Sequence, residues 1–232
     1  DEADFVRNHL GPSFEKNNIK TKILIYDHNA DRPDYPISIL DDPQARKYID
    51  GSAFHLYNGT IDALTDVHDA YPTKNIYFTE QMVVQFNRNH VESKGLNIAW
   101  PVSRLIIGAP RNWCKNVLLW NLAADPDFKP FTDRGGCGSC QGAVTIDKDS
   151  VTYNLAYYTM AHVSKFVRPG SVRIASDPQD SLPNVAFTTP SKEKVLIVAN
   201  VSNAEQTFDI MYHDEHATAI LQPRSVATYI WK

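Results

Sequence analysis

Residues 75–81 read Asn-Ile-Tyr-Phe-Thr-Glu-Gln, and this stretch gives the clearest indication of the fold. Apolar, β-branched and aromatic residues fill positions 76–79, which predicts a short buried strand that ends at the carboxylate of Glu80. Three other runs have the same character and also end in polar or aromatic groups: residues 22–27, 52–57 and 116–121. Because parallel sheets and barrels place their chemistry at the carboxyl ends of their strands, this pattern predicts a functional site around Glu80.

Helical patterns alternate with the four strands, at a spacing of roughly 20–40 residues from one strand to the next. This alternation is typical of βαβ units and a parallel sheet. The helices are expected over residues 2–17, 42–49, 60–71, 97–109 and 151–166. We expect Gly11-Pro12 to interrupt the first helix, Asp42-Pro43 to cap the second and Pro110 to stop the fourth. The stretch 122–150, rich in Asp, Pro and Gly, is expected to be a long loop.

After Gly170 the pattern changes to short strands with no helix between them. Turn formers such as Asp177-Pro178 and Gln222-Pro223 separate the apolar runs. The expected strands cover residues 171–176, 184–188, 194–200, 206–212, 216–221 and 225–231. Such a series predicts an antiparallel β-sandwich. We therefore expect one domain over residues 1–169 and a second, all-β domain over residues 170–232.

The bulk properties of the chain argue against several classes of protein. The chain has 232 residues, 43% hydrophobic content and a formal net charge of −4. It shows no basic stripe, which argues against nucleic-acid binding, and its apolar runs are too short to span a bilayer. The acidic N-terminus, residues 1–4, does not resemble a signal peptide. We expect either that a signal was removed or that the chain starts inside a longer protein.

The cysteine pair Cys137-Gly-Ser-Cys140 allows several interpretations. A zinc site needs a second pair of ligands, which Cys114 alone does not supply. A redox motif is expected to open a helix, and this pair lies in a glycine-rich segment. A local disulfide in an exported protein is slightly favoured over two free thiols. We expect no metal and no cofactor.

Four motifs carry a resemblance to a known family: residues 54–57, 77–81, 118–123 and 162–170. In their order and spacing, followed by the sandwich pattern, they resemble the C-terminal half of a glycoside hydrolase family 30 enzyme, the glucosylceramidase and β-1,6-glucanase group. The loop at residues 132–137 looks more like the glucanase branch. The resemblance implies an α/β plus all-β fold: the C-terminal half of a (β/α)8 TIM barrel followed by an antiparallel β-sandwich.

The resemblance also implies roles for individual residues. Members of the family retain configuration at the anomeric carbon, and Glu80 matches their nucleophile. The positions that match sugar-contacting residues of the site are Asp27, His28, His55, Tyr57, Trp120 and Asn121. Hydrogen bonds from His55 and Tyr57 to Glu80 are expected to favour its charged form. The substrate implied is a carbohydrate with β-glucosidic bonds, in a glucan or a glucosylceramide-like glycolipid.

The chain departs from the family in one respect. The family's acid/base glutamate follows an asparagine at the end of the fourth barrel strand, and no Asn-Glu dipeptide occurs in this sequence. We therefore expect a fragment that lacks the acid/base, that is inactive alone, and that associates with the missing half of the barrel or with itself. We expect the complete protein to be exported, in an extracellular or periplasmic setting.

Each assignment has a simpler alternative. Glu80 alone could be a surface carboxylate, Trp120 a core tryptophan and Asp27 a strand-end cap. Asp133 and Arg134 either pair with each other or line outer subsites. For the whole chain, the alternative to a retaining β-glycosidase is a non-catalytic carbohydrate-binding or assembly module.

Overall fold

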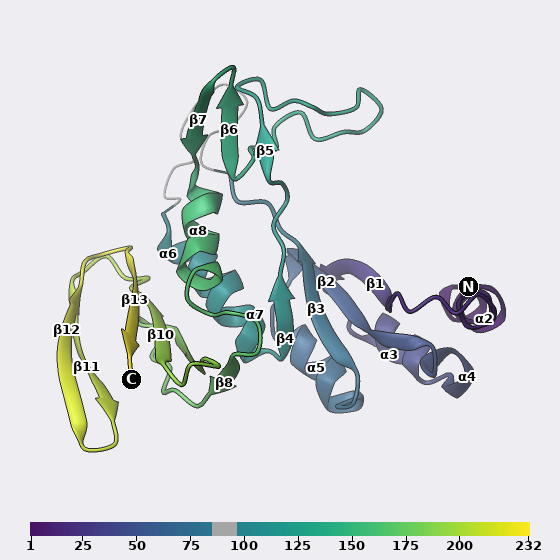
Figure 1. The fold of residues 1–232 in the computed structure, drawn as a ribbon, viewed down its shortest axis with the longest axis horizontal. Coiled ribbons are helices and arrows are strands. Elements are labelled where there is room, and N and C mark those ends of the chain that lie inside the picture. Colours follow the sequence, from purple (N-terminus) through teal and green to yellow (C-terminus); the bar gives the residue numbers. More distant parts are fainter. Residues whose placement is uncertain (85–96) are drawn as a thin grey trace. The chain divides into compact units, whose positions relative to one another are not determined.

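The computed structural model describes residues 1–84 and 97–232. The chain divides into two compact units, which Figure 1 shows as a ribbon. The first unit consists of residues 1–81 and 109–118. The second consists of residues 82–108, as far as they are described, and residues 119–232.

The first unit is built on a parallel sheet with the strand order β1-β2-β3-β4. The strands are β1 (Ile23–Ala30), β2 (Ile49–Gly59), β3 (Asn75–Glu80) and β4 (Cys114–Val117). Each neighbouring pair runs parallel, as the alternating sequence pattern predicted. The inner strands carry apolar side chains that are fully buried, among them Phe54 and Phe78. A parallel sheet is normally buried in this way because crossover helices cover it.

Helices precede β1 and connect β1 to β2 and β2 to β3 (Figure 1). They are α1 (Glu2–Phe5), η1 (Val6–Leu10), α2 (Gly11–Lys16), α3 (Asp34–Leu40), α4 (Pro43–Arg46) and α5 (Ala63–Ala70). Helix α3 contacts β1, and α5 contacts β2 and β3. The predicted cap of the second helix is confirmed, because the side chain of Asp42 accepts hydrogen bonds from the backbone amides of Gln44 and Ala45. Asp42 therefore satisfies amides that the first turn of α4 leaves unpaired.

Two expected helix breaks are wrong. Gly11-Pro12 lies within the continuous helical run η1–α2, with Gly11 in the right-handed α conformation. Pro110 lies inside α7 (Gly108–Arg111), after α6 (Ala99–Pro101) and η2 (Val102–Ile107). In both cases a π-helical segment precedes the proline. The wider π turn leaves room for the proline ring, which clashes with the carbonyl four residues earlier in a regular α-helix.

The fourth strand is shorter than predicted and begins earlier. β4 ends at Val117 rather than at Asn121. The side chain of Asn116 takes over part of the ladder, because its Oδ1 accepts from the amide of Phe78 at 3.1 Å. One further backbone bond, from the Leu118 amide to the Phe78 carbonyl, follows at 3.0 Å. The register of β3 against β4 shifts between Ile76 and Phe78, and β4 ends just after this irregularity.

The second unit contains a small sheet that the sequence reading missed. Its strands are β5 (Ala123–Ala124), β6 (Val144–Asp147) and β7 (Ser150–Tyr153), in the order β5-β6-β7. The expected loop 122–150 is therefore wrong at both ends, and helix α8 (Leu155–Ser164) begins later than expected. The period-two alternation in residues 144–153 is the signal for this hairpin. Lys148 supplies the positive φ that its tight turn requires.

The all-β part of the second unit follows the prediction closely. Its strands are β8 (Val172–Ile174), β9 (Asn184–Thr188), β10 (Lys194–Ala199), β11 (Gln206–Tyr212), β12 (Glu215–Leu221) and β13 (Val226–Trp231). They form an antiparallel sheet of order β13-β10-β9-β8 and the hairpin β11-β12. Val198 and Leu221 belong to one buried cluster, and Phe208 packs against it. The two sheets therefore share a core, and the predicted antiparallel sandwich is confirmed.

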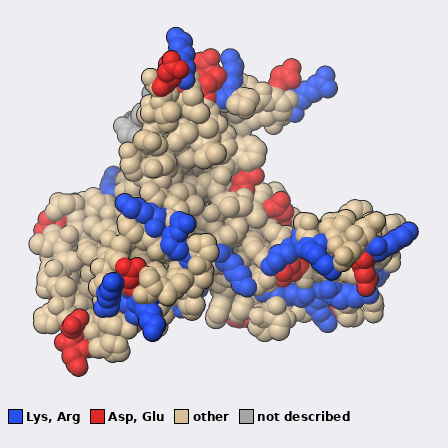
Figure 2. Space-filling model, in the orientation of Figure 1, with Lys and Arg blue, Asp and Glu red and all other residues tan. Residues whose placement is uncertain are grey.

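Charged groups of both signs are interspersed on the face that Figure 2 shows. This mixture agrees with the formal net charge of −4. Among the described residues, no helix has the length and apolar character needed to cross a membrane.

Asp50, in β2, is the centre of a polar network in the first unit. Its Oδ2 accepts hydrogen bonds from the Tyr77 hydroxyl at 2.6 Å and from Asn75 Nδ2 at 2.7 Å. Its Oδ1 lies 3.0 Å from Lys22 Nζ. Burial by itself raises the pKa of the Asp50 carboxyl, but these three partners outweigh it and hold the pKa below its ordinary value. The folded state therefore favours charged Asp50.

We expect Asp50→Asn to lower the free energy of unfolding of the full-length protein by about 1.5–3 kcal/mol at pH 7. Because the pKa of Asp50 is lowered by folding, its contribution is present above about pH 4 and is lost as the pH falls through the folded-state pKa. Urea titrations at pH 7 and pH 3 measure this difference. Asp133→Asn, at an exposed loop position, is the matched control. An equal loss for Asp50→Asn at both pH values would contradict the prediction.

Candidate active site

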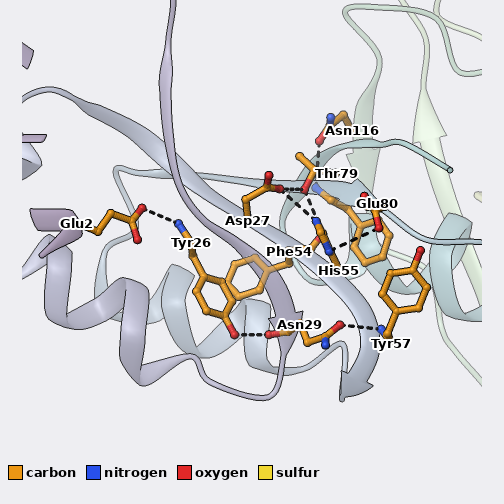
Figure 3. Close-up of polar contacts among 11 residues, drawn as sticks. Glu2, Tyr26, Asp27, Asn29, Phe54, His55, Tyr57, Thr79, Glu80 and Asn116 are labelled. Carbon is orange, nitrogen blue, oxygen red and sulfur yellow. Dashed lines mark hydrogen bonds and ion pairs between the residues drawn. The ribbon is translucent and has the colours of Figure 1, made fainter. Parts of the chain in front are cut away.

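Three neighbouring strands of the first unit each bring one polar side chain to their carboxyl ends (Figure 3). Asp27 comes from β1, His55 from β2 and Glu80 from β3. In the ladders, Asn29 pairs with His55 and His55 pairs with Glu80, so these strand ends are in register. The predicted grouping of Asp27, His55 and Glu80 at one edge of the parallel sheet is what the structure shows.

The distances within this group define an ordered chain of contacts. The Thr79 hydroxyl donates to Asp27 Oδ1 at 2.6 Å, and His55 Nε2 lies 3.2 Å from the same oxygen. On the other side of the imidazole, His55 Nδ1 lies 3.9 Å from Glu80 Oε1. That last distance is too long for a hydrogen bond and describes an ion-pair contact when His55 is protonated. The expected hydrogen bond from His55 to Glu80 is therefore wrong for this structure.

A bulge in β1 determines where the Asp27 carboxylate lies. Tyr26 and Asp27 have positive φ angles of 75° and 46°, and the register of β1 against β2 shifts between Tyr26 and His28. Bulges of this kind redirect side chains near active sites. The amide of Tyr26 donates to Glu2 Oε1 at 3.0 Å, and its ring packs against Phe54 with centroids 5.4 Å apart. These contacts hold a backbone conformation that a bulky residue rarely adopts.

His28 and Tyr57 surround His55. The ring centroids of His28 and Tyr57 lie 6.3 Å and 6.2 Å from that of His55, both in edge-on arrangements. The amide of Tyr57 donates to Asn29 Oδ1 at 3.1 Å, which ties the end of β2 to that of β1. Five of the seven predicted site residues are thus close together within the first unit.

Trp120 and Asn121 belong to the second unit, and their grouping with Glu80 stays a prediction. Trp120 is 46% exposed, so the alternative of a core tryptophan is wrong for this structure. The Trp120–Asn121 peptide is cis, and the Asn121 carbonyl accepts from the Ala143 amide at 2.8 Å. Asn121 Oδ1 is buried and has no hydrogen-bond partner among the described residues.

The cysteine pair is bridged. Cys137 and Cys140 form a disulfide, as the sequence slightly favoured. Cys114 is a free cysteine, and burial raises the pKa of its thiol far above the usual range. The described residues contain no group of three or more His, Cys, Asp or Glu side chains placed to hold a metal ion. Asp133 and Arg134 are both exposed, and no ion pair joins them in the described part of the chain.

Thr79 is the residue of this site that sequence reasoning missed. It lies one position before Glu80 in a run that reads as a plain β-strand, and a threonine there is typical of strands in general. Its hydroxyl contacts Asp27, which lies in the bulge of β1. The sequence held no separate signal for that contact.

Comparison with known families identifies both parts of the chain. The glycosyl hydrolase family 30 TIM-barrel domain matches residues 1–167, and the family 30 β-sandwich domain matches residues 170–229. The chain belongs to glycosyl hydrolase family 30. The family resemblance and the fold class expected from the sequence are therefore confirmed.

Family 30 members of two kinds are similar to the chain. An endo-1,6-β-D-glucanase of Neurospora crassa is 36% identical over 178 residues, which cover 74% of this chain and 35% of that protein. The lysosomal acid glucosylceramidase of Mus musculus is 27% identical over 244 residues, which cover all of this chain and 46% of that protein. A solved structure of an endo-β1,6-glucanase matches 99% of this chain and 53% of its own, with a TM-score of 0.86 and 31% identity. The chain thus spans about half, or less, of the length of these family 30 relatives.

Proposed function

We propose that this chain is the C-terminal part of a retaining β-glycosidase that acts on β-glucosidic bonds, with Glu80 as its nucleophile. The single observation that carries the proposal is the position of the Glu80 carboxylate at the carboxyl end of β3, beside His55 and Asp27. Membership of family 30 supports it. A barrel places reacting groups at this end of its strands.

In the proposed mechanism, a Glu80 oxygen attacks the anomeric carbon of the sugar. The bond from that carbon to the leaving oxygen breaks as the new ester bond forms, and a second carboxyl protonates the leaving oxygen. A water molecule, deprotonated by that second group, then releases the sugar with its configuration retained. In a retaining enzyme the two carboxyls lie about 5–5.5 Å apart. We propose that the second carboxyl comes from the N-terminal part of the barrel in the full-length protein.

The remaining predicted residues bind the sugar in this proposal. Asp27, 65% exposed at its side chain, can accept hydrogen bonds from sugar hydroxyls. His28 and Tyr57 flank His55 at the strand ends. Trp120 offers an exposed ring to the C–H face of a sugar. Asn121 holds a buried carbonyl oxygen that lacks a partner in the described chain, and a buried acceptor of this kind favours a bound donor.

A glucan is the preferred substrate class. The endo-1,6-β-glucanase relatives are 29–36% identical to the chain, whereas the glucosylceramidase relatives are 24–27% identical. This difference supports a β-1,6-linked glucan over a glucosylceramide-like glycolipid, which stays the second candidate. We propose that residues 1–169 form the second half of the barrel and residues 170–232 its side sandwich. The Cys137–Cys140 disulfide supports export to an oxidising compartment.

The rival proposal is a non-catalytic carbohydrate-binding or assembly module. Intact Glu80, with His55 and Asp27 placed beside it, favours the enzyme, because a binding module has no need of a nucleophilic carboxylate with these neighbours. For the chain of residues 1–232 alone, the absence of turnover stays a prediction. General acid assistance is typically worth about 10²–10⁴-fold, and Glu80 cannot supply it while acting as nucleophile.

A stereochemical assay of the full-length protein tests the proposal. With a β-1,6-glucan as substrate, proton NMR of the first sugar released should show the β-anomer before mutarotation. A glucosylceramide in detergent, assayed in parallel, should be hydrolysed far more slowly. An initial α-anomer would show inversion and exclude Glu80 as a nucleophile. No release from either substrate would favour the binding module.

A further inference from the structure

The Asp27 carboxylate is unusually well held for an exposed group. Its side chain is 65% exposed, yet its Oδ1 lies close to groups from two other strands: the Thr79 hydroxyl of β3 at 2.6 Å and His55 Nε2 of β2 at 3.2 Å. A charged acceptor makes hydrogen bonds that are shorter and stronger than neutral ones. The shorter of the two contacts comes from the Thr79 hydroxyl.

The backbone on either side of Asp27 adds to this restraint. The positive φ angles of Tyr26 and Asp27 cost free energy and persist only where surrounding contacts impose them. Glu2 Oε1 accepts from the Tyr26 amide at 3.0 Å on one side of the bulge. Thr79 holds the Asp27 side chain on the other (Figure 3). Contacts from two other elements, α1 and β3, thus hold Asp27 and the bulge around it.

The position of Asp27 in turn fixes the orientation of His55. The Nε2 edge of the imidazole lies 3.2 Å from Asp27 Oδ1. The same ring orientation places Nδ1 on the side of Glu80, 3.9 Å from its Oε1. His55 is only 13% exposed at its side chain, and its ring has little freedom to turn. The order of contacts therefore runs from Thr79 to Asp27, from Asp27 to His55, and from His55 to Glu80.

We propose that Thr79 is a positioning residue of the reaction. Its hydroxyl fixes Asp27, and Asp27 in turn fixes the orientation of the His55 ring, whose Nδ1 edge lies toward Glu80. This inference rests on the proposed role of Glu80 as nucleophile. Thr79 itself need not touch the sugar. Its second possible acceptor, the Phe54 carbonyl, lies 3.4 Å away and competes weakly with Asp27.

A matched pair of variants tests the hydroxyl alone. Thr79→Val keeps the branched shape and strand preference and removes the hydroxyl, whereas Thr79→Ser keeps the hydroxyl. In the full-length protein, Thr79→Val should lower kcat by about 10- to 100-fold, the loss expected for a hydrogen bond to a charged group. KM should change less than about threefold, since Thr79 makes no proposed contact with substrate. Thr79→Ser should restore kcat to within about threefold of the natural enzyme.

A double-mutant cycle separates positioning from general damage. If Thr79 acts through Asp27, Thr79→Val should have almost no further effect in an Asp27→Asn background. Thermal unfolding of each variant shows whether the fold is kept. Natural kcat in Thr79→Val, equal losses in the Val and Ser variants, or multiplying losses in the double variant would each overturn the inference. Full activity in Glu80→Gln would instead overturn the proposed function on which it rests.

Discussion

Replacing Glu80 by Gln in the full-length protein is expected to lower kcat by about 10⁴-fold or more, because losses of this size follow removal of a catalytic nucleophile. Gln keeps the size of the side chain and removes the charge that attacks the anomeric carbon. The contact of Glu80 with His55 is 3.9 Å long, so its loss should change the free energy of unfolding by less than about 1 kcal/mol. Steady-state kinetics on a β-glucan and urea denaturation provide the two readouts.

The matched control for this variant is Glu215→Gln, in β12. Glu215 is an exposed carboxylate of the hairpin β11-β12. Its replacement makes the same chemical change at a site without a proposed role, and both kcat and stability should stay near their natural values. Activity retained in Glu80→Gln at a tenth of the natural rate or more would show that another group performs the attack.

Trp120→Ala is expected to lower kcat/KM by about 30- to 1000-fold, the range for a dominant aromatic contact with a ligand. Trp120 is 46% exposed, so the substitution leaves no large cavity. Its effect on unfolding should stay well under the ~3–5 kcal/mol that a buried tryptophan contributes. Kinetics and thermal denaturation together decide between a sugar platform and a packing role.

Trp113 provides the control for Trp120. It has the same exposed fraction, 46%, and its ring stacks on His68 with centroids 3.9 Å apart. It precedes β4, at the end of the sheet opposite to Glu80, where residues of a barrel serve stability rather than chemistry. Trp113→Ala should therefore leave kcat/KM unchanged. Equal activity losses in the two variants, or a loss of stability with normal kinetics in Trp120→Ala, would contradict the proposed sugar contact.

The sequence predicted the strands best where burial on both faces leaves a long apolar run. β3 was expected to end at Glu80 and does so. The sandwich strands were located within a few residues because turn formers separate them. The predicted end of β4 was wrong. The side chain of Asn116 accepts a ladder hydrogen bond in place of a backbone carbonyl, and no local sequence pattern predicts this.

The geometry of the candidate site was harder to predict than the residues that form it. The pattern of strand ends predicted that Asp27, His55 and Glu80 lie close together. It did not predict the bulge at Tyr26, whose positive φ runs against the preference of an aromatic residue. The contact of Thr79 with Asp27 involves a residue of that bulge, and so does the contact that orients the imidazole ring of His55. Both are tertiary effects, set by Glu2 and Phe54 from other elements.

The most direct test of the account is to identify the residue that becomes covalently attached to the sugar. A 2-deoxy-2-fluoro-β-glucoside with a good leaving group accumulates the glycosyl-enzyme, because the fluorine slows both steps and the leaving group restores the first. Peptide mass spectrometry of the digested full-length protein should then find one sugar per chain, on the peptide that carries Glu80. A label on any other residue, or none in an enzyme that still releases the leaving group, would contradict the assignment of Glu80 as nucleophile.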